Sequence, residues 1–186
     1  MKIKMNAIEI MNEEHVYIKR MLRVIRTASY KLLKEDEVNY DDFTVIIDFI
    51  RNFADDHHHR KEEKILFLKM IENLGSTAEK VVKNGMLVEH DLSRLYIKDL
   101  EIALAKVKSN NNEAKLDVIA NAVSYANLLE RHIDKEDKVI YKYGERELSK
   151  EVLDEVNREC LEFEVENAHI RNKYIDILES LEKKYS

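Results

Sequence analysis

Each half of the chain carries the same pattern of potential metal ligands: a Glu-His pair, followed further along by a His and a Glu four residues apart. The two copies are Glu14-His15 with His58 and Glu62, and Glu89-His90 with His132 and Glu136. The copies are offset by 75 residues in the first pair and by 74 in the second. Residues four apart on an α-helix lie on the same face, one turn apart. A duplicated helical hairpin would therefore bring two imidazoles and one carboxylate inward from each half, and build a two-metal site with approximate two-fold symmetry.

The rest of the sequence predicts an all-α protein. It contains no proline and only three glycines, and no stretch alternates apolar and polar residues over the length of a strand. We expect long helices over about residues 7–34, 43–73, 90–106 and 113–143, and a further helical segment over about 149–184. Asp41 or Asp42 is expected to cap the second helix, Gly75 to end it and Gly144 to close the fourth, with a break near Gly85. These elements predict an up-and-down four-helix bundle in a single domain of residues 1–186, with its core at about 7–145 and the C-terminal segment packed onto it.

The proposed ligands lie on the apolar stripes of their own helices. His58 and Glu62 continue the line of Ile47, Ile50 and Ala54 at helical spacing. Buried carboxylates are costly unless a cation compensates them, so the stripes predict a bound metal. The six candidate metal ligands are His15, His58, Glu62, His90, His132 and Glu136. Mixed imidazole and carboxylate coordination suits iron, with zinc, manganese or copper as weaker options.

As a set, these motifs resemble the hemerythrin-like HHE cation-binding family. The resemblance covers about residues 8–145 and rests on the two Glu-His pairs and on the runs His58-His59-Arg60-Lys61-Glu62-Glu63 and His132-Ile133-Asp134-Lys135-Glu136-Asp137. It implies a four-helix bundle around a non-haem di-iron centre with an oxygen-derived bridge. The ligands it implies are His15 and His58 for one iron, His90 and His132 for the other, and Glu62 and Glu136 as bridges. A ferritin-like site fits less well, because such sites are dominated by glutamate and use Glu-x-x-His.

One position departs from the pattern of the oxygen-carrying members. They have a fifth histidine one turn before the third-helix ligand, where this chain has Met86. We therefore expect the metal held by His90 and His132 to have an open position, or to take Glu89, water or His169 instead.

The consecutive histidines 57–59 require a choice of register. Neighbouring residues are ~100° apart on an α-helix, so His57, His58 and His59 cannot all face one site. We expect His58 with Glu62 to be the ligand pair, rather than His59 with Glu63. The other two histidines should lie on the outer face or behind the ligands.

Other side chains near the motifs have simpler interpretations. Tyr17, Tyr96 and Tyr125 lie near proposed ligands, either as core aromatics or as hydrogen-bond donors to a bound oxygen species. Lys61 and Lys135 are expected on a solvated face of the bundle.

Two classes of function fit such a centre. The first is a module that binds or senses O2, nitric oxide, peroxide or iron. The second is a di-iron oxidoreductase that decomposes peroxide, reduces nitric oxide, or oxidises and stores iron. An open metal position would favour rapid autoxidation and reaction with peroxide or nitric oxide over oxygen carriage. A metal-free interaction bundle is disfavoured, because Glu62 and Glu136 would stay uncompensated.

Composition limits the partners that we expect. Basic and acidic residues number 31 and 37 and are interleaved, and the net charge of −6 opposes nucleic-acid binding. No stretch approaches the ~20 apolar residues of a membrane helix. The basic start, residues 1–5, meets Glu9 before an apolar signal segment forms, and Cys160 alone can form no internal disulfide. We expect a cytoplasmic protein with a small diatomic or peroxide ligand, no membrane or nucleic-acid partner, and a protein partner left open.

Overall fold

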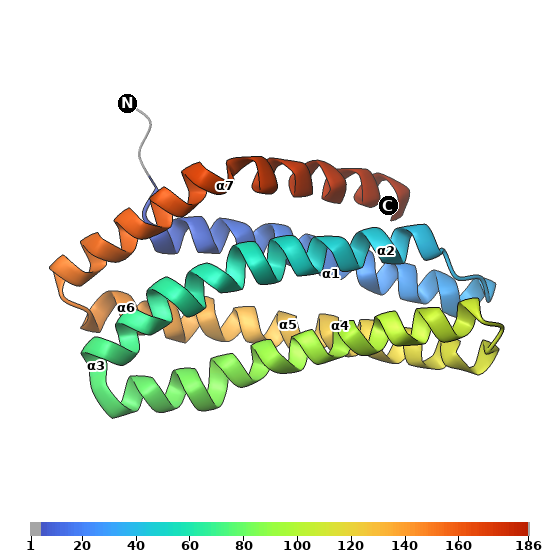
Figure 1. Ribbon diagram of the computed structural model, residues 1–186, viewed down its shortest axis with the longest axis horizontal. Coiled ribbons are helices and arrows are strands. Elements are labelled where there is room, and N and C mark those ends of the chain that lie inside the picture. Colours follow the sequence, from blue (N-terminus) through green and yellow to red (C-terminus); the bar gives the residue numbers. More distant parts are fainter. Residues whose placement is uncertain (1–4, 186) are drawn as a thin grey trace.

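The computed structural model describes residues 5–185, which form a bundle of long helices with no strand among them. In chain order, with η marking π- and 3-10-helical segments, the elements are α1 (Ala7–Glu35), α2 (Tyr40–Phe49), η1 (Ile50–His59), η2 (Glu62–Leu66), α3 (Phe67–Val81), η3 (Val82–Met86), α4 (Leu87–Lys108), η4 (Asn112–Ala114), α5 (Lys115–Lys135), η5 (Glu136–Ile140), α6 (Tyr141–Glu147) and α7 (Lys150–Tyr185). The predicted all-α bundle with a C-terminal helix is confirmed (Figure 1). The basic start and both ends of the predicted domain, residues 1–4 and 186, lie outside the described part.

Local sequence sets where the first two helices begin and end. Asn6 caps α1 by accepting a hydrogen bond from the Glu9 backbone, and the Glu9 side chain returns one to Asn6. Asp36 ends α1 in a left-handed conformation, with φ of 56°. The cap of α2 is Asn39, which accepts from the Asp42 backbone at 3.0 Å. The predicted Asp41 or Asp42 cap was therefore wrong, because an asparagine stood closer to the true start.

The three glycines have different roles. Gly75 has a φ of 71° and marks the turn between the second and third long helices of the bundle, as predicted. Gly85 stays helical within η3, so the predicted break there was wrong. Gly144 does not end the fourth helix, which continues to Glu147. A Cβ at Gly144 would meet the Met70 sulfur at 3.3 Å, so this glycine serves close packing between helices.

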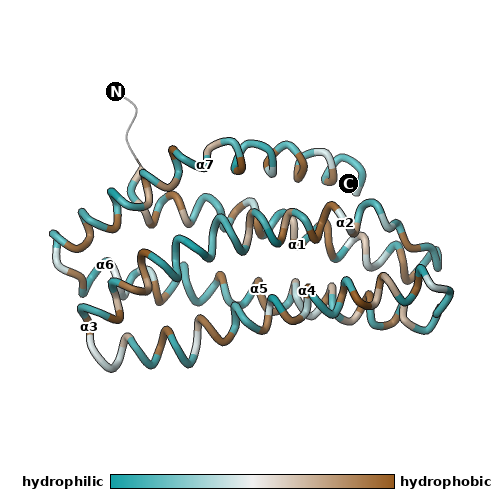
Figure 2. The backbone as a smooth tube through the Cα atoms, viewed as in Figure 1, coloured by the Kyte–Doolittle hydropathy of each residue, from teal (hydrophilic) through white to brown (hydrophobic). Residues whose placement is uncertain are grey.

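The core consists of two apolar clusters with a polar layer between them. One cluster extends from Ile18 toward Leu32 on α1, and the other contains Ala7 and Met11 on the same helix. His15 lies between them on α1, and each of the other three long helices of the bundle likewise has buried polar residues between its two apolar stretches. The polar layer is formed by these residues: His15, His58, His59, Glu62, His90, His132 and Glu136. Figure 2 shows apolar residues recurring along every helix of the bundle. The polar layer is therefore closed off from solvent at both ends.

The C-terminal helix α7 packs along α1 and α2. Arg20 forms two hydrogen bonds to Glu182, at 2.9 and 2.6 Å, and the Tyr174 hydroxyl donates to Asp48 at 2.9 Å. Cys160 is fully buried on α7, and burial raises the pKa of its thiol to about 12. Cys160 therefore packs as a small apolar side chain in the cluster that contains Ala7 and Met11. No helix within residues 5–185 is long and apolar enough to cross a bilayer.

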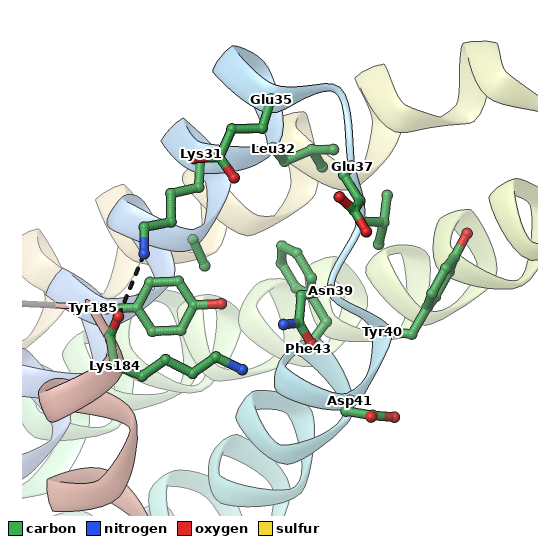
Figure 3. A pocket seen from close by; sticks show the side chains of 12 residues that line it. Lys31, Leu32, Glu35, Glu37, Asn39, Tyr40, Asp41, Phe43, Lys184 and Tyr185 are labelled. Atoms are coloured by element: carbon green, nitrogen blue, oxygen red, sulfur yellow. Dashed lines mark hydrogen bonds between the residues drawn. The ribbon is translucent and has the colours of Figure 1, made fainter.

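A pocket of about 470 Å³ lies at the end of the bundle where the α1–α2 loop meets the end of α7 (Figure 3). Phe43 and Leu32 contribute to its wall, and Lys31 donates a hydrogen bond to the Lys184 carbonyl across it at 3.4 Å. None of the predicted ligands lines this pocket. The candidate site must therefore be sought in the polar layer itself.

Candidate metal centre

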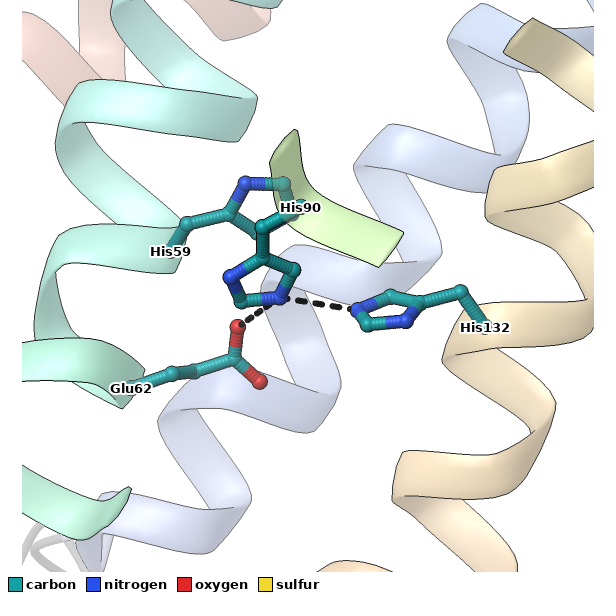
Figure 4. Close-up of side chains that lie close together, drawn as sticks. All are labelled: His59, Glu62, His90 and His132. Atoms are coloured by element: carbon teal, nitrogen blue, oxygen red, sulfur yellow. Dashed lines mark hydrogen bonds and ion pairs between the residues drawn. The ribbon is translucent and has the colours of Figure 1, made fainter. Parts of the chain in front are cut away.

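The polar layer contains two groups of four side chains whose ligand atoms all lie within 4.8 Å of one another. The first group is His15, His58, Glu62 and Glu136, and the second is His59, Glu62, His90 and His132. Every member is buried, and Glu62 belongs to both groups. All six predicted ligands are thus brought together, and His59 joins them. Figure 4 shows the second group, with His90 between Glu62 and His132.

The two glutamates lie between the groups in the manner of bridging ligands. Glu62 Oε2 is 3.6 Å from His58 Nε2 and 3.5 Å from His90 Nε2. Glu136 Oε2 is 3.4 Å from His15 Nε2, and its Oε1 is 2.9 Å from His132 Nε2. Each carboxylate therefore faces an imidazole of both halves of the chain.

Several buried atoms in this layer lack the partner that their chemistry requires. His58 Nε2, Glu62 Oε2 and both oxygens of Glu136 are buried without a hydrogen-bond partner within residues 5–185. The Nε2 atoms of His90 and His132 also face each other at 2.9 Å. Buried polar groups are normally satisfied, and orphaned ones cost free energy. Lone pairs converging from imidazoles and carboxylates are the donor set of a transition-metal site, so the residues fit bound cations.

Every imidazole of the two groups is oriented by a carboxylate at its other ring nitrogen. The Nδ1 contacts are His15–Asp137 at 2.6 Å, His58–Glu14 at 2.8 Å, His59–Asp55 at 3.3 Å, His90–Glu63 at 2.8 Å and His132–Glu89 at 2.8 Å. Such a carboxylate holds the proton on Nδ1, leaves Nε2 free as a ligand and fixes the plane of the ring. Glu89, one of the three alternatives for the open position, instead orients His132.

A lysine or arginine side chain contacts each carboxylate that orients a histidine. The pairs are Lys61 with Glu14, Lys135 with Glu89, Lys19 with Asp137, and Arg94 with both Asp55 and Glu63. These pairs follow the sequence repeat, because Lys61 matches Lys135 and Lys19 matches Arg94. Lys61 is completely buried, so its predicted place on a solvated face was wrong, whereas Lys135 is 43% exposed. The burial of Lys61 results from α7, since Glu164 also contacts its ammonium.

The local helix geometry explains why both His58 and His59 face inward. Residues Ile50–His59 form a π-helical segment, which has more residues per turn than an α-helix and so rotates less from one residue to the next. The expectation that two of the three histidines lie outside the site was wrong: only His57 does. His57 is buried against Glu14 and Glu164, with Nε2 at 3.1 Å from both. The expectation that Glu62 lies in the centre and Glu63 outside it agrees with the structure.

His59 occupies the half of the centre where an open position was expected. Its ring stacks on His90, with 3.8 Å between centroids and 9° between planes. Met86 is buried in the apolar cluster that contains Ala7 and Met11, and His169 is exposed on α7. The group around His90 and His132 thus has a third imidazole, from His59, and neither Glu89 nor His169 belongs to it. The half with two imidazoles is the one formed by His15 and His58.

A sequence signal for His59 was present. Asp55 and His59 are four residues apart on one helix, the spacing at which a carboxylate can orient an imidazole. The matching positions of the second half are Leu129 and Ile133. The first half therefore has polar residues at two positions that are apolar in the second half.

Tyr141 is a site residue that the sequence pattern did not single out. Its hydroxyl donates to Glu62 Oε1 at 2.5 Å and lies 3.4 Å from His15 Nε2. Burial and the charge of Glu62 raise the pKa of Tyr141 well above its ordinary value, so the phenol keeps its proton. Tyr125, in contrast, lies on the His59 side, and neither Tyr17 nor Tyr96 is hydrogen-bonded to a ligand.

The protonation states of the layer are strongly coupled. Burial and the charge of Glu136 raise the pKa of Glu62 well above its ordinary value. Burial opposes the charge of Glu136, but the charge of His132, whose Nε2 lies 2.9 Å from Glu136 Oε1, outweighs it and holds the pKa of Glu136 low. Burial and the nearby His15 lower the pKa of His58 to about 4, whereas Glu136 raises that of His132 to about 9 against the effect of burial. Without a metal, protons therefore supply part of the positive charge that this layer requires.

Comparison with known proteins identifies the family. Residues 6–143 match the Hemerythrin HHE cation binding domain. An uncharacterized protein of Mycobacterium bovis and uncharacterized proteins of two strains of Mycobacterium tuberculosis are each 22% identical over 140 residues, which cover 75% of this chain and 54% of theirs. The chain thus spans about half the length of these relatives. No solved structure matches it. With the match covering most of the chain and all the ligand groups, the protein belongs to the hemerythrin HHE cation-binding family.

Proposed function

We propose that the protein holds two iron ions in its polar layer and uses them to bind a small oxygen- or nitrogen-containing ligand. His15 and His58 would hold one ion, and His59, His90 and His132 the other. Glu62 and Glu136 would lie between them. The observation that carries this proposal is the set of buried imidazole nitrogens and carboxylate oxygens without a hydrogen-bond partner, because a bound cation would satisfy them together.

Iron fits this donor set better than the other metals considered. Five imidazoles and two carboxylates form a mixed nitrogen and oxygen environment, without the thiolates that would favour zinc or copper(I). Bound iron would supply redox chemistry and a position for an exogenous ligand. Zinc and manganese remain weaker alternatives for the same residues.

The chain's own contribution is to orient ligands, exclude water and hold protons. The orienting carboxylates fix the rings, and the apolar clusters on either side keep solvent from the layer. The half formed by His15 and His58 has one imidazole fewer than the other, so we assign the coordination position for a small ligand to this half. Tyr141 lies beside it with a hydrogen-bond donor. These features support binding or sensing of O2, nitric oxide or peroxide there.

Peroxide decomposition is the second candidate, and the position of Tyr141 favours it. A phenol beside a ligand position can donate a hydrogen bond to an oxygen atom, or pass a proton to it. Reversible binding of a ligand needs only the hydrogen bond, whereas turnover of peroxide also needs the transfer of a proton.

Stopped-flow spectra of the iron(II)-loaded protein distinguish the two. We expect two irons per chain by metal analysis, and a spectral change on mixing with O2, nitric oxide or peroxide. A long-lived adduct would support binding, and repeated consumption of peroxide would support catalysis. A well-folded protein that cannot be loaded with two metals would overturn both.

A further inference from the structure

The outer face of α4 carries three exposed apolar side chains at intervals of seven residues. They are Val88, Leu95 and Ile102, which are 53%, 48% and 44% exposed. All three lie within the α-helical span Leu87–Lys108, so their side chains follow one line along the helix. The opposite face of α4 is buried in the bundle, chiefly against α5 (Figure 1). The three side chains therefore form an apolar stripe, the α4 stripe, that stays exposed in the part of the chain described.

Two residues of opposite charge lie between the apolar residues of the α4 stripe. Asp91 follows Val88 by three residues, and Lys98 follows Leu95 by three. Positions with this spacing form the contact line between the helices of a two-stranded coiled coil. Lys98 is exposed and has no ion-pair partner within residues 5–185. Asp91 is 78% exposed and pairs with Arg94 of its own helix at 3.0 Å, so its carboxylate is still open to a second cation.

A second copy of the chain would match the α4 stripe if its α4 ran in the opposite direction. With Leu95 of the two copies face to face, Val88 lies opposite Ile102 of the second copy, because each is seven residues from Leu95. Asp91 lies four residues before Leu95 and Lys98 three residues after it, so these opposite charges meet within ~1.5 Å along the helix axis. Parallel copies would instead place like charges together. The stripe is therefore self-complementary in the antiparallel orientation.

We propose that the α4 stripe is a homodimer interface, in which two copies of the chain pack antiparallel about a two-fold axis at Leu95. A two-fold contact requires a surface that complements itself, and the signs and spacing of Asp91 and Lys98 provide one. A stable interface buries roughly 800 Å² on each partner, which is more than three half-exposed side chains supply. The dimer is therefore weak and reversible. No residue of the stripe belongs to a ligand group, so the inference goes beyond the proposed function and does not depend on it.

Sedimentation velocity of the whole chain tests this contact. Between about 10 µM and 1 mM protein we expect a reversible shift from monomer to dimer. Leu95→Glu places two carboxylates at the two-fold axis and should leave a monomer at every concentration. Leu33→Glu is the matched control, because Leu33 is 66% exposed but lies on α1, and it should leave dimerisation unchanged. Circular dichroism verifies that both variants are folded, as expected for changes at exposed positions.

Exchanging the two charges tests the orientation. Asp91→Lys and Lys98→Asp should each weaken the dimer about three- to tenfold, because each sets like charges opposite one another in antiparallel copies. The double variant restores the opposite charges and should dimerise as the native protein does.

The outcomes that would overturn the proposal are distinct from those that bear on the metal centre. A native protein that stays monomeric up to the highest concentration, or a dimer that persists in Leu95→Glu, would show that α4 is not the interface. A dimer that depends on Leu95 but is unchanged by either single charge substitution would show that the copies are not antiparallel. Metal content should equal that of the native protein in every variant, so a failure of dimerisation leaves the proposed function untouched.

Discussion

Tyr141 donates its hydroxyl to Glu62, and this hydrogen bond breaks the two-fold symmetry of the metal centre. The matching residue in the first half is Phe67, which packs against His90 as Tyr141 packs against His15. The two rings occupy equivalent positions, but only one can donate. The two halves of the centre therefore differ in proton chemistry as well as in the number of imidazoles.

Replacing Tyr141 with phenylalanine should destabilise the metal-free protein. Glu62 Oε1 would lose its donor while remaining buried, at a cost of about 1–3 kcal/mol in the free energy of unfolding. Denaturant unfolding measures this directly. Tyr143→Phe is the control, because Tyr143 is only partly buried and donates no hydrogen bond in the described structure. Equal effects of the two substitutions would contradict the role given to Tyr141.

His59→Ala should lower the metal content, although the residue was first expected to lie outside the centre. Loss of one of the three imidazoles weakens the binding of the metal ion that His59 would share with His90 and His132. Occupancy should therefore fall from two metals per chain toward one. His169→Ala removes an exposed imidazole and should leave metal content unchanged. Full occupancy in His59→Ala would show that His59 is not a ligand.

Arg94 should act as a positioning residue. Its guanidinium contacts Asp55 and Glu63 at 2.7 Å each, and these carboxylates orient His59 and His90. Arg94→Gln should therefore weaken metal binding by about tenfold without removing a ligand. The control is Arg26→Gln, which makes the same change in charge on an exposed face. A competition titration with a chromophoric chelator gives both affinities.

Lys61 and Lys135 form a matched pair for testing burial. Each contacts the carboxylate that orients a histidine, but Lys61 is completely buried and Lys135 is 43% exposed. Lys61→Met leaves Glu14 buried without its cation and should lower the free energy of unfolding, measured by denaturant unfolding, by about 3–5 kcal/mol. Lys135→Met should cost less than about 1 kcal/mol, since solvent screens the exposed pair. Similar losses of stability in Lys61→Met and Lys135→Met would mean that α7 does not shield Lys61 from solvent.

Metal loading should release protons. In the metal-free protein the pKa of His132 is raised to about 9, so this residue binds a proton at pH 7, and the raised pKa of Glu62 acts in the same direction. A metal must displace these protons, and apparent affinity should therefore rise with pH until it levels near pH 9. Loading in a weakly buffered solution with an indicator dye measures the release. Affinity that is independent of pH between 6 and 9 would refute these assignments.

Much of the centre follows from helical periodicity in the sequence. The stripe through Ile47, Ile50 and Ala54 placed His58 and Glu62 inside, and the repeat placed their counterparts. The stripe is a local signal, because side-chain direction along a regular helix depends only on spacing.

The residues that were misplaced depend on information that spacing does not contain. His59 faces inward because the preceding segment is π-helical, and the α-helical rotation of ~100° per residue does not apply there. Lys61 is buried because α7 covers it and supplies Glu164, and no pattern in the bundle helices shows where α7 docks. The first error arose from the geometry within one helix, and the second from a contact between two elements.

The two halves of the chain contact each other at the centre in the way that two subunits do at an interface. His15 is oriented by Asp137 of the second half, and His90 by Glu63 of the first, so neither hairpin alone contains a complete ligand environment. Two identical hairpins with these contacts would have to associate as a homodimer, and one gene would then impose the same residues on both metals. Joined in a single chain, the copies are free to diverge. Asp55 with His59 in one copy, and Tyr141 in the other, mark where they have become different.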